Sequence, residues 1–175
     1  MEMTEPTTFR IVTEESQVTF LGESSVHPIE ARVAPSGWFT AALGPEGIEE
    51  ASGAEGRIEI PVTDLSSGNP LLDRETKRRT DAKRYPSITG DLTRVVGIAG
   101  AGATVEGRIA FRGEDVDVEG DVELTEIAPD RLVIVGEGLF DVRWWGLEPP
   151  KLLMLKVHPE ITVRIRLVMD AEPSA

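Results

Sequence analysis

The sequence predicts one all-β domain, an extended antiparallel barrel of about eight strands with a single inserted helix. Most of the 175 residues follow a two-residue alternation of apolar and polar side chains, which is typical of strands with one buried face. Turn-forming Gly, Pro, Ser and Asp residues separate the alternating segments, and one segment breaks the pattern. Strands that follow one another without intervening helices indicate an antiparallel sandwich or barrel.

The N-terminal half contains short alternating segments, each long enough for one strand. Their apolar positions are Phe9 and Ile11, Val18 and Phe20, Phe39 and Leu43, Ile58, Ile60 and Val62, and Ile88 and Leu92. Arg57 and Glu59 occupy the opposite face of the fourth segment, so this strand is expected to turn its isoleucines toward the interior.

The C-terminal half contains longer strands of the same kind. The expected inward faces carry Val105, Ile109 and Phe111; Val116, Val118, Val122 and Leu124; Leu132, Ile134, Phe140 and Val142; and Ile161, Val163, Ile165, Leu167 and Met169. The same faces contain Gly107, Gly120, Gly136 and Gly138. Two interpretations of these glycines stay open: they leave a lumen inside the barrel, or they allow long strands to bend.

A helix is predicted over residues 70–83. Asn69 can cap its first turn, Pro70 suits the first helical position, and Pro86 restricts Tyr85 to extended backbone. Residues 73–84 contain six of the chain's 18 basic residues and three acidic ones. This pattern is typical of a solvated helix face with i,i+4 ion pairs. The alternative is a basic lip in which Arg78 and Arg79 contact an anionic head group or a membrane surface.

Composition excludes several classes of function. The chain has no cysteine and a formal net charge of -13, which argues against disulfides, thiolate chemistry and nucleic acid as a partner. His27 and His158 lie far from one another in the sequence, and the acidic residues between 115 and 126 follow strand periodicity rather than a calcium loop. We therefore expect no catalytic residue, metal or cofactor.

The expected organisation is a single domain over residues 8–171, with tails at 1–7 and 172–175. The first residues contain neither a basic nor an apolar run of the kind that marks a signal peptide, and no apolar run is long enough to cross a bilayer. These features predict a cytoplasmic protein.

Four segments resemble the YceI-like family of polyisoprenoid-binding proteins. They read GRIEIPVTDLSSGN at 56–69 with LDR at 72–74, RYPSI at 84–88, VEGRIAFRG at 105–113 and FDVRWWGL at 140–147. The resemblance covers roughly residues 8–170. It implies a lipocalin-like barrel with an inserted helix, able to hold an isoprenoid quinone or a related long-chain amphiphile, and it implies no catalytic residue.

An apolar lumen suits a long-chain lipid, because each buried methylene stabilises the complex by about 0.8 kcal/mol. The residues expected to line the cavity or its entrance are Phe20, Phe39, Ile58, Ile60, Leu71, Leu72, Tyr85, Ile109, Phe111, Phe140 and Trp144. Strand alternation from Phe140 places Trp144 inside and Trp145 outside, where Trp145 would join an apolar patch that contacts a membrane or a second subunit.

The predicted function is therefore binding or carriage of an isoprenoid quinone, a polyisoprenoid or a fatty-acid-like lipid. Two alternatives remain at this stage. One is a structural or stress-associated interaction protein with a filled barrel. The other is an enzyme that acts on a hydrophobic substrate, which would need an ionisable residue on an inward face.

Overall fold

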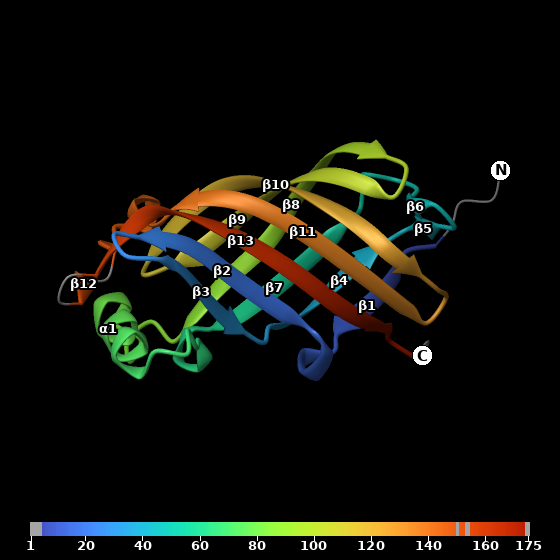
Figure 1. The fold of residues 1–175 in the computed structure, drawn as a ribbon. Helices are drawn as coiled ribbons and strands as arrows, with labels where there is room; N and C mark the ends of the chain where they lie inside the picture. Colours follow the sequence, from blue (N-terminus) through green and yellow to red (C-terminus); the bar gives the residue numbers. More distant parts are fainter. Residues whose placement is uncertain (1–4, 150, 153–154, 174–175) are drawn as a thin grey trace.

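The protein folds as a closed antiparallel β-barrel, as the alternation predicts (Figure 1). The computed structural model describes residues 5–149, 151–152 and 155–173. The strands are β1 (Thr7–Ile11), β2 (Gln17–Ser24), β3 (Pro28–Val33), β4 (Ser36–Ala41), β5 (Leu43–Gly44), β6 (Gly47–Ile48), β7 (Glu55–Pro61), β8 (Ser87–Ala99), β9 (Gly102–Phe111), β10 (Glu114–Ile127), β11 (Arg131–Asp141), β12 (Lys151–Leu152) and β13 (Leu155–Ala171). The helix α1 spans Pro70–Thr80, and the short 3-10 helices η1, η2 and η3 span Thr13–Glu15, Val62–Asp64 and Val142–Trp145.

The barrel closes through the long last strand, β13. The closed ring runs β1-β4-β7-β8-β9-β10-β11-β13, and β13 returns to β1 by pairing Phe9 with Ala171. Nearer its start, β13 pairs with β2, which in turn pairs with β3. The long strand β13 thus pairs with β1 near its end and with β2 near its start. β2 and β3 thereby add to the sheet at the α1 end.

Burial follows the predicted faces of the strands. Along β10 the inward residues Val116, Val118, Val122 and Leu124 are partly or fully buried, and the acidic residues between them are exposed. The sequence prediction of these faces is confirmed. Side chains in a strand point alternately to the two sides of the sheet, so a closed barrel sends one set into the interior.

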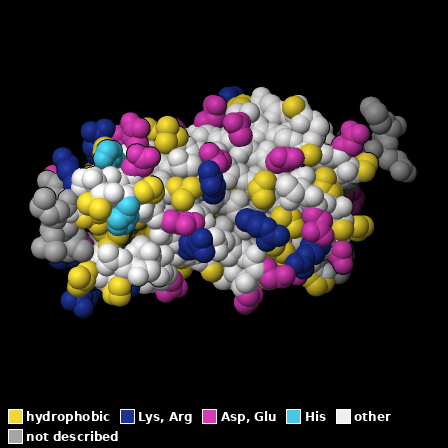
Figure 2. All heavy atoms as spheres, in the orientation of Figure 1, with side chains coloured by type: hydrophobic (Ala, Val, Ile, Leu, Met, Phe, Trp, Pro, Cys, Tyr) yellow, Lys and Arg dark blue, Asp and Glu magenta, His cyan; other side chains and the backbone are white. Residues whose placement is uncertain are grey.

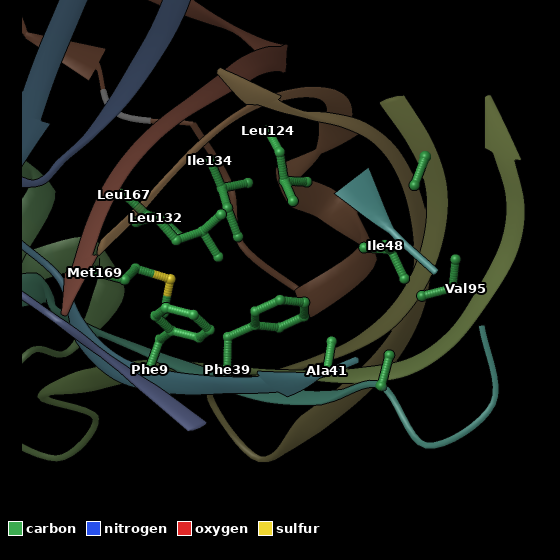
Figure 3. Packing of buried hydrophobic residues seen from close by; sticks show 12 residues of the cluster. Phe9, Phe39, Ala41, Ile48, Val95, Leu124, Leu132, Ile134, Leu167 and Met169 are labelled. Atoms are coloured by element: carbon green, nitrogen blue, oxygen red, sulfur yellow. The ribbon is translucent and has the colours of Figure 1, made fainter. Parts of the chain in front are cut away.

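The two ends of the barrel are covered differently. Away from α1, the largest buried cluster packs in the interior, and Figure 3 shows Phe9, Phe39, Leu132 and Met169 pointing toward one another there. Ile48 of the β5–β6 hairpin belongs to the same cluster. The opposite end carries α1, η2, η3 and β12 (Figure 1). One end is therefore packed with its own side chains, and the other is covered by separate elements.

The helix α1 is three residues shorter than predicted. Asn69 caps it as expected, because its side-chain oxygen accepts hydrogen bonds from the backbone N–H groups of Leu71 (3.1 Å) and Leu72 (3.2 Å). The C-terminus differs, since Asp81 adopts the left-handed conformation (φ 53°, ψ 55°) and its N–H bonds back to Arg78 and Lys77 carbonyls. A left-handed residue at this position ends the helix before Ala82.

The prediction for the tandem tryptophans is wrong. Strand β11 ends at Asp141, whose carboxylate accepts a hydrogen bond from the Arg143 N–H (2.9 Å) and starts the 3-10 helix η3. Strand alternation does not apply in a 3-10 helix, so Trp145 is buried (7% exposed) and Trp144 is half exposed (50%).

Candidate ligand-binding cavity

Two adjacent cavities occupy the barrel interior. A cavity of about 260 Å³ extends from the buried cluster around Phe39, Ile48 and Met169 toward the α1 end, and one of about 200 Å³ lies at the α1 end. Both are lined by Ile60, Ile109, Phe140 and Val163, which come from four different strands. The shared wall places the two cavities side by side in one apolar interior. Their combined volume falls in the range of small-molecule sites, roughly 300–1,000 Å³.

The inward glycines have two different roles. A Cβ at Gly136 would come within 3.0–3.1 Å of Val122, the Asp121 carbonyl and Ile165, so this glycine permits close packing. A Cβ at Gly120 would meet only the Glu137 carbonyl oxygen, at an ordinary 3.4 Å. Gly120 lines the larger cavity, and the space beside it is open. The open space beside Gly120 fits the interpretation of a lumen, whereas the close contacts at Gly136 reflect tight packing, which neither interpretation predicted.

The charged residues along the larger cavity direct their side chains outward. Five of the seven form cross-strand ion pairs on the outer surface, where both partners are substantially exposed: Arg57–Asp91, Arg94–Glu106, Arg108–Asp117 and Arg164–Glu137. The other two, Glu119 and Asp121, are exposed. The inward surface of the cavity consists of aliphatic, aromatic and glycine residues. Such a surface favours hydrocarbon and gives a polar ligand few hydrogen-bond partners.

Trp145 forms a wall of the smaller cavity. Its indole Nε1 donates a hydrogen bond to the Ile109 carbonyl (3.0 Å), and its ring meets Phe140 edge-on with centroids 6.4 Å apart. Arg112 donates to the Gly146 carbonyl (2.9 Å) and so fixes the end of η3. These contacts hold the Trp145 ring in one orientation at the α1 end of the barrel.

The few polar groups near the cavities lie at the α1 end. Thr76, Arg79 and Thr80 of α1 and His158 of β13 line the smaller cavity. Thr80 donates its hydroxyl to the Thr76 carbonyl within the helix (2.8 Å). His158 is exposed, and the smaller cavity is only partly enclosed.

Glu75 holds two arginines of α1 in place. Its carboxylate accepts hydrogen bonds from Arg78 (2.6 Å) and Arg79 (2.8 Å). These hydrogen bonds lower the pKa of Glu75 to about 2, because they stabilise its charged form. Arg79 therefore lines the cavity as part of an ion pair, whereas Arg78 is mostly exposed on the outer side of the helix.

The structure places the predicted lining residues in three groups. Phe39 and Ile58 line the larger cavity, Phe20 and Phe111 line the smaller one, and Ile60, Ile109 and Phe140 line both. Leu72 and Tyr85 are buried or half-buried near this end and do not line either cavity.

Leu71 and Trp144 also line neither cavity. Leu71 is 54% exposed on α1, next to the buried Leu72. Trp144 is replaced in the wall by Trp145. The signal for this exchange was present in the sequence, since Asp141 can cap a helical turn and Gly146 can end one.

Other candidate sites do not assemble. The acidic residues between 115 and 126 lie on the continuous strand β10, which excludes a calcium loop there. Within the described ranges, no three His, Asp or Glu side chains are grouped so that they could hold a metal ion. No helix in the described part of the chain is long and apolar enough to cross a membrane.

A closed antiparallel barrel with an apolar interior and an inserted helix is a lipocalin-like fold. A family model for the YceI-like domain matches residues 9–169. The chain therefore belongs to the YceI-like domain family.

Solved structures share this fold at low sequence identity. Burkholderia cenocepacia BcnA has a TM-score of 0.77 and 16% identity, over 90% of this chain and 98% of that one. A polyisoprenoid binding domain from Saccharophagus degradans, implicated in plant cell wall breakdown, has a TM-score of 0.70 and 13% identity, over 94% and 98%. The Campylobacter jejuni YCEI protein has a TM-score of 0.65 and 14% identity, over 82% and 85%. No curated protein sequence matches this chain.

Proposed function

We propose that this protein binds or carries a long-chain apolar or amphiphilic lipid inside the barrel. The observation that carries the proposal is the pair of adjoining cavities with walls of aliphatic, aromatic and glycine residues. Each methylene buried there would contribute about 0.8 kcal/mol to binding. An isoprenoid quinone, a polyisoprenoid and a fatty-acid-like chain all fit this chemistry.

The polar part of the ligand is expected at the α1 end. Arg79, Thr76 and His158 border the smaller cavity, whose wall presents almost no polar atoms. The head group is therefore expected at the margin of the cavity, where a guanidinium is suited to a carbonyl or an anionic group. Arg78 faces outward and does not line this cavity. Of the two arginines proposed for head-group contact, Arg79 borders the cavity but is paired with Glu75 and Glu148.

The proposal is for a binding protein rather than an enzyme. The charged side chains along the larger cavity form ion pairs outside the barrel or, at Glu119 and Asp121, are exposed, and general acid–base chemistry needs an ionisable group within reach of the substrate. The polar groups at the α1 end are better suited to hold a head group. A cytoplasmic location stays a prediction from the sequence, to be checked by cell fractionation.

Organic extraction of the purified protein followed by mass spectrometry tests the proposal. We expect one long-chain species in near-stoichiometric amount, or uptake of added quinone or fatty acid by protein that is purified empty. Empty protein that also takes up neither kind of lipid would contradict the proposal and favour a structural role.

A further inference from the structure

Three large apolar side chains are exposed at the α1 end of the barrel. Trp144 of η3 is 50% exposed, Leu71 of α1 is 54% exposed, and Val26 in the β2–β3 turn is 65% exposed. Figure 2 shows hydrophobic side chains beside Lys and Arg side chains at this end of the molecule. Exposed apolar side chains that gather at one place commonly mark a contact with a partner or a membrane.

These side chains are connected to the walls of the smaller cavity. The Trp144 ring lies 6.0 Å from the ring of Trp145, which lines it. The β2–β3 turn is fixed to the start of β13, where the Ser25 N–H donates to the Lys156 carbonyl (2.9 Å). Val157 and His158, which follow Lys156, also line this cavity. The exposed apolar surface and the opening of the cavity therefore share one end of the barrel.

The charge of α1 and the turn after it is opposite in sign to that of the whole chain. The formal net charge is -13, yet residues 73–84 contain six basic and three acidic residues. Arg74, Lys77, Lys83 and Arg84 are exposed. Among the described residues, none of these four side chains takes part in a salt bridge within 4.0 Å. Their charges are available to an external anionic surface.

We propose that the α1 end of the barrel docks on an anionic lipid bilayer. Trp144 and Leu71 enter the interfacial layer, and the basic side chains of α1 and the turn after it contact the head groups. Indole rings favour the membrane–water interface, and each basic residue near an anionic leaflet strengthens binding. A bilayer is favoured over a second copy docked through the same end, because a two-fold dimer would place the basic segments of two α1 helices against each other.

Docking in this orientation places the opening of the smaller cavity against the bilayer. A lipid chain can then move between membrane and barrel without crossing water. This step rests on the proposed function, whereas the docking itself does not require a bound ligand. The two can therefore fail independently in an experiment.

Co-sedimentation with vesicles tests the docking. The probes are vesicles of phosphatidylcholine alone and vesicles with equal parts of phosphatidylserine and phosphatidylcholine. We expect binding to the anionic vesicles only. Substituting Arg74→Gln together with Lys77→Gln should weaken this binding roughly 30-fold, at about 1 kcal/mol for each charge removed.

The matched control is Arg10→Gln with Arg94→Gln, which removes the same charge at positions away from α1. It should change vesicle binding by less than about threefold, because distant exposed charges are screened. Lipids brominated in their acyl chains should quench the tryptophan fluorescence of the wild-type protein and should quench a Trp144→Phe variant much less.

Three outcomes would overturn the proposal. The first is an absence of binding to anionic vesicles, and the second is binding that both double variants weaken equally. The third is a Trp144-dependent dimer in sedimentation analysis without vesicle binding, which would assign this surface to a second copy. Ligand uptake is measured in parallel without vesicles. Normal uptake without docking would contradict the docking and leave the proposed function in place. Docking without uptake would contradict the proposed function and leave the docking in place.

Discussion

Replacing Gly120 by leucine tests whether the larger cavity is the binding site. Gly120 lines that cavity from β10, and a Cβ there would meet only the Glu137 carbonyl oxygen at 3.4 Å. The leucine side chain can therefore extend into the open space without displacing backbone. It has four carbon atoms and should exclude roughly four methylenes of a bound chain, which at about 0.8 kcal/mol each is about 3 kcal/mol.

That loss corresponds to a roughly 200-fold higher dissociation constant for a long-chain ligand. The free energy of unfolding should stay the same or increase, since a strand glycine is unfavourable and the added side chain is buried. The assay is a titration with a quinone that quenches tryptophan fluorescence, together with urea unfolding of each variant.

Gly97→Leu is the matched control. Gly97 lies on β8 away from the cavity lining, and a Cβ there would meet nothing within 4 Å. We expect this variant to bind as the wild type does. If Gly120→Leu remained folded and bound within about threefold of the wild type, the chain of the ligand would not occupy this cavity.

Three further predictions concern the elements at the α1 end. Trp145→Ala should lower the free energy of unfolding by about 3–5 kcal/mol because it removes a buried ring, whereas Trp144→Ala should change it by less than about 0.5 kcal/mol; urea unfolding that gave equal effects would contradict the assignment. Asn69→Ala should cost about 1 kcal/mol through loss of the helix cap, with faster amide exchange in the first turn of α1 as the readout. The Glu75 carboxyl should titrate near pH 2 by NMR. Because this pKa is lowered on folding, the stabilisation is present above about pH 4.5 and is lost as the pH falls toward 2, so Glu75→Gln should destabilise the protein at pH 6 and have little effect at pH 2.

The candidate site shows where local pattern is sufficient and where it is not. Ile60, Ile109 and Phe140 were expected on the wall from alternation alone, and they line both cavities. Val163 lies on a predicted inward face and was missed as a lining residue. It lines both cavities, and the position at which the two cavities adjoin depends on several strands together. Thr76 was missed as well, since nothing in the sequence tells which face of α1 packs against the barrel.

The sequence by itself determined the class of fold and the inward face of nearly every strand. It could do so because strand alternation is a local property that each segment carries independently, and a closed barrel turns one complete face inward. The excess of basic residues at 73–84 was equally visible.

Only the tertiary structure decided which end of the barrel is packed and which is covered by separate elements. It also decided that Trp145, rather than Trp144, reaches the interior, because the chain turns into η3 after Asp141. Gly120 and Gly136 are chemically identical in the sequence, and their different roles come from neighbouring strands. Free space inside a barrel depends on how side chains from all its strands meet, which no single segment contains.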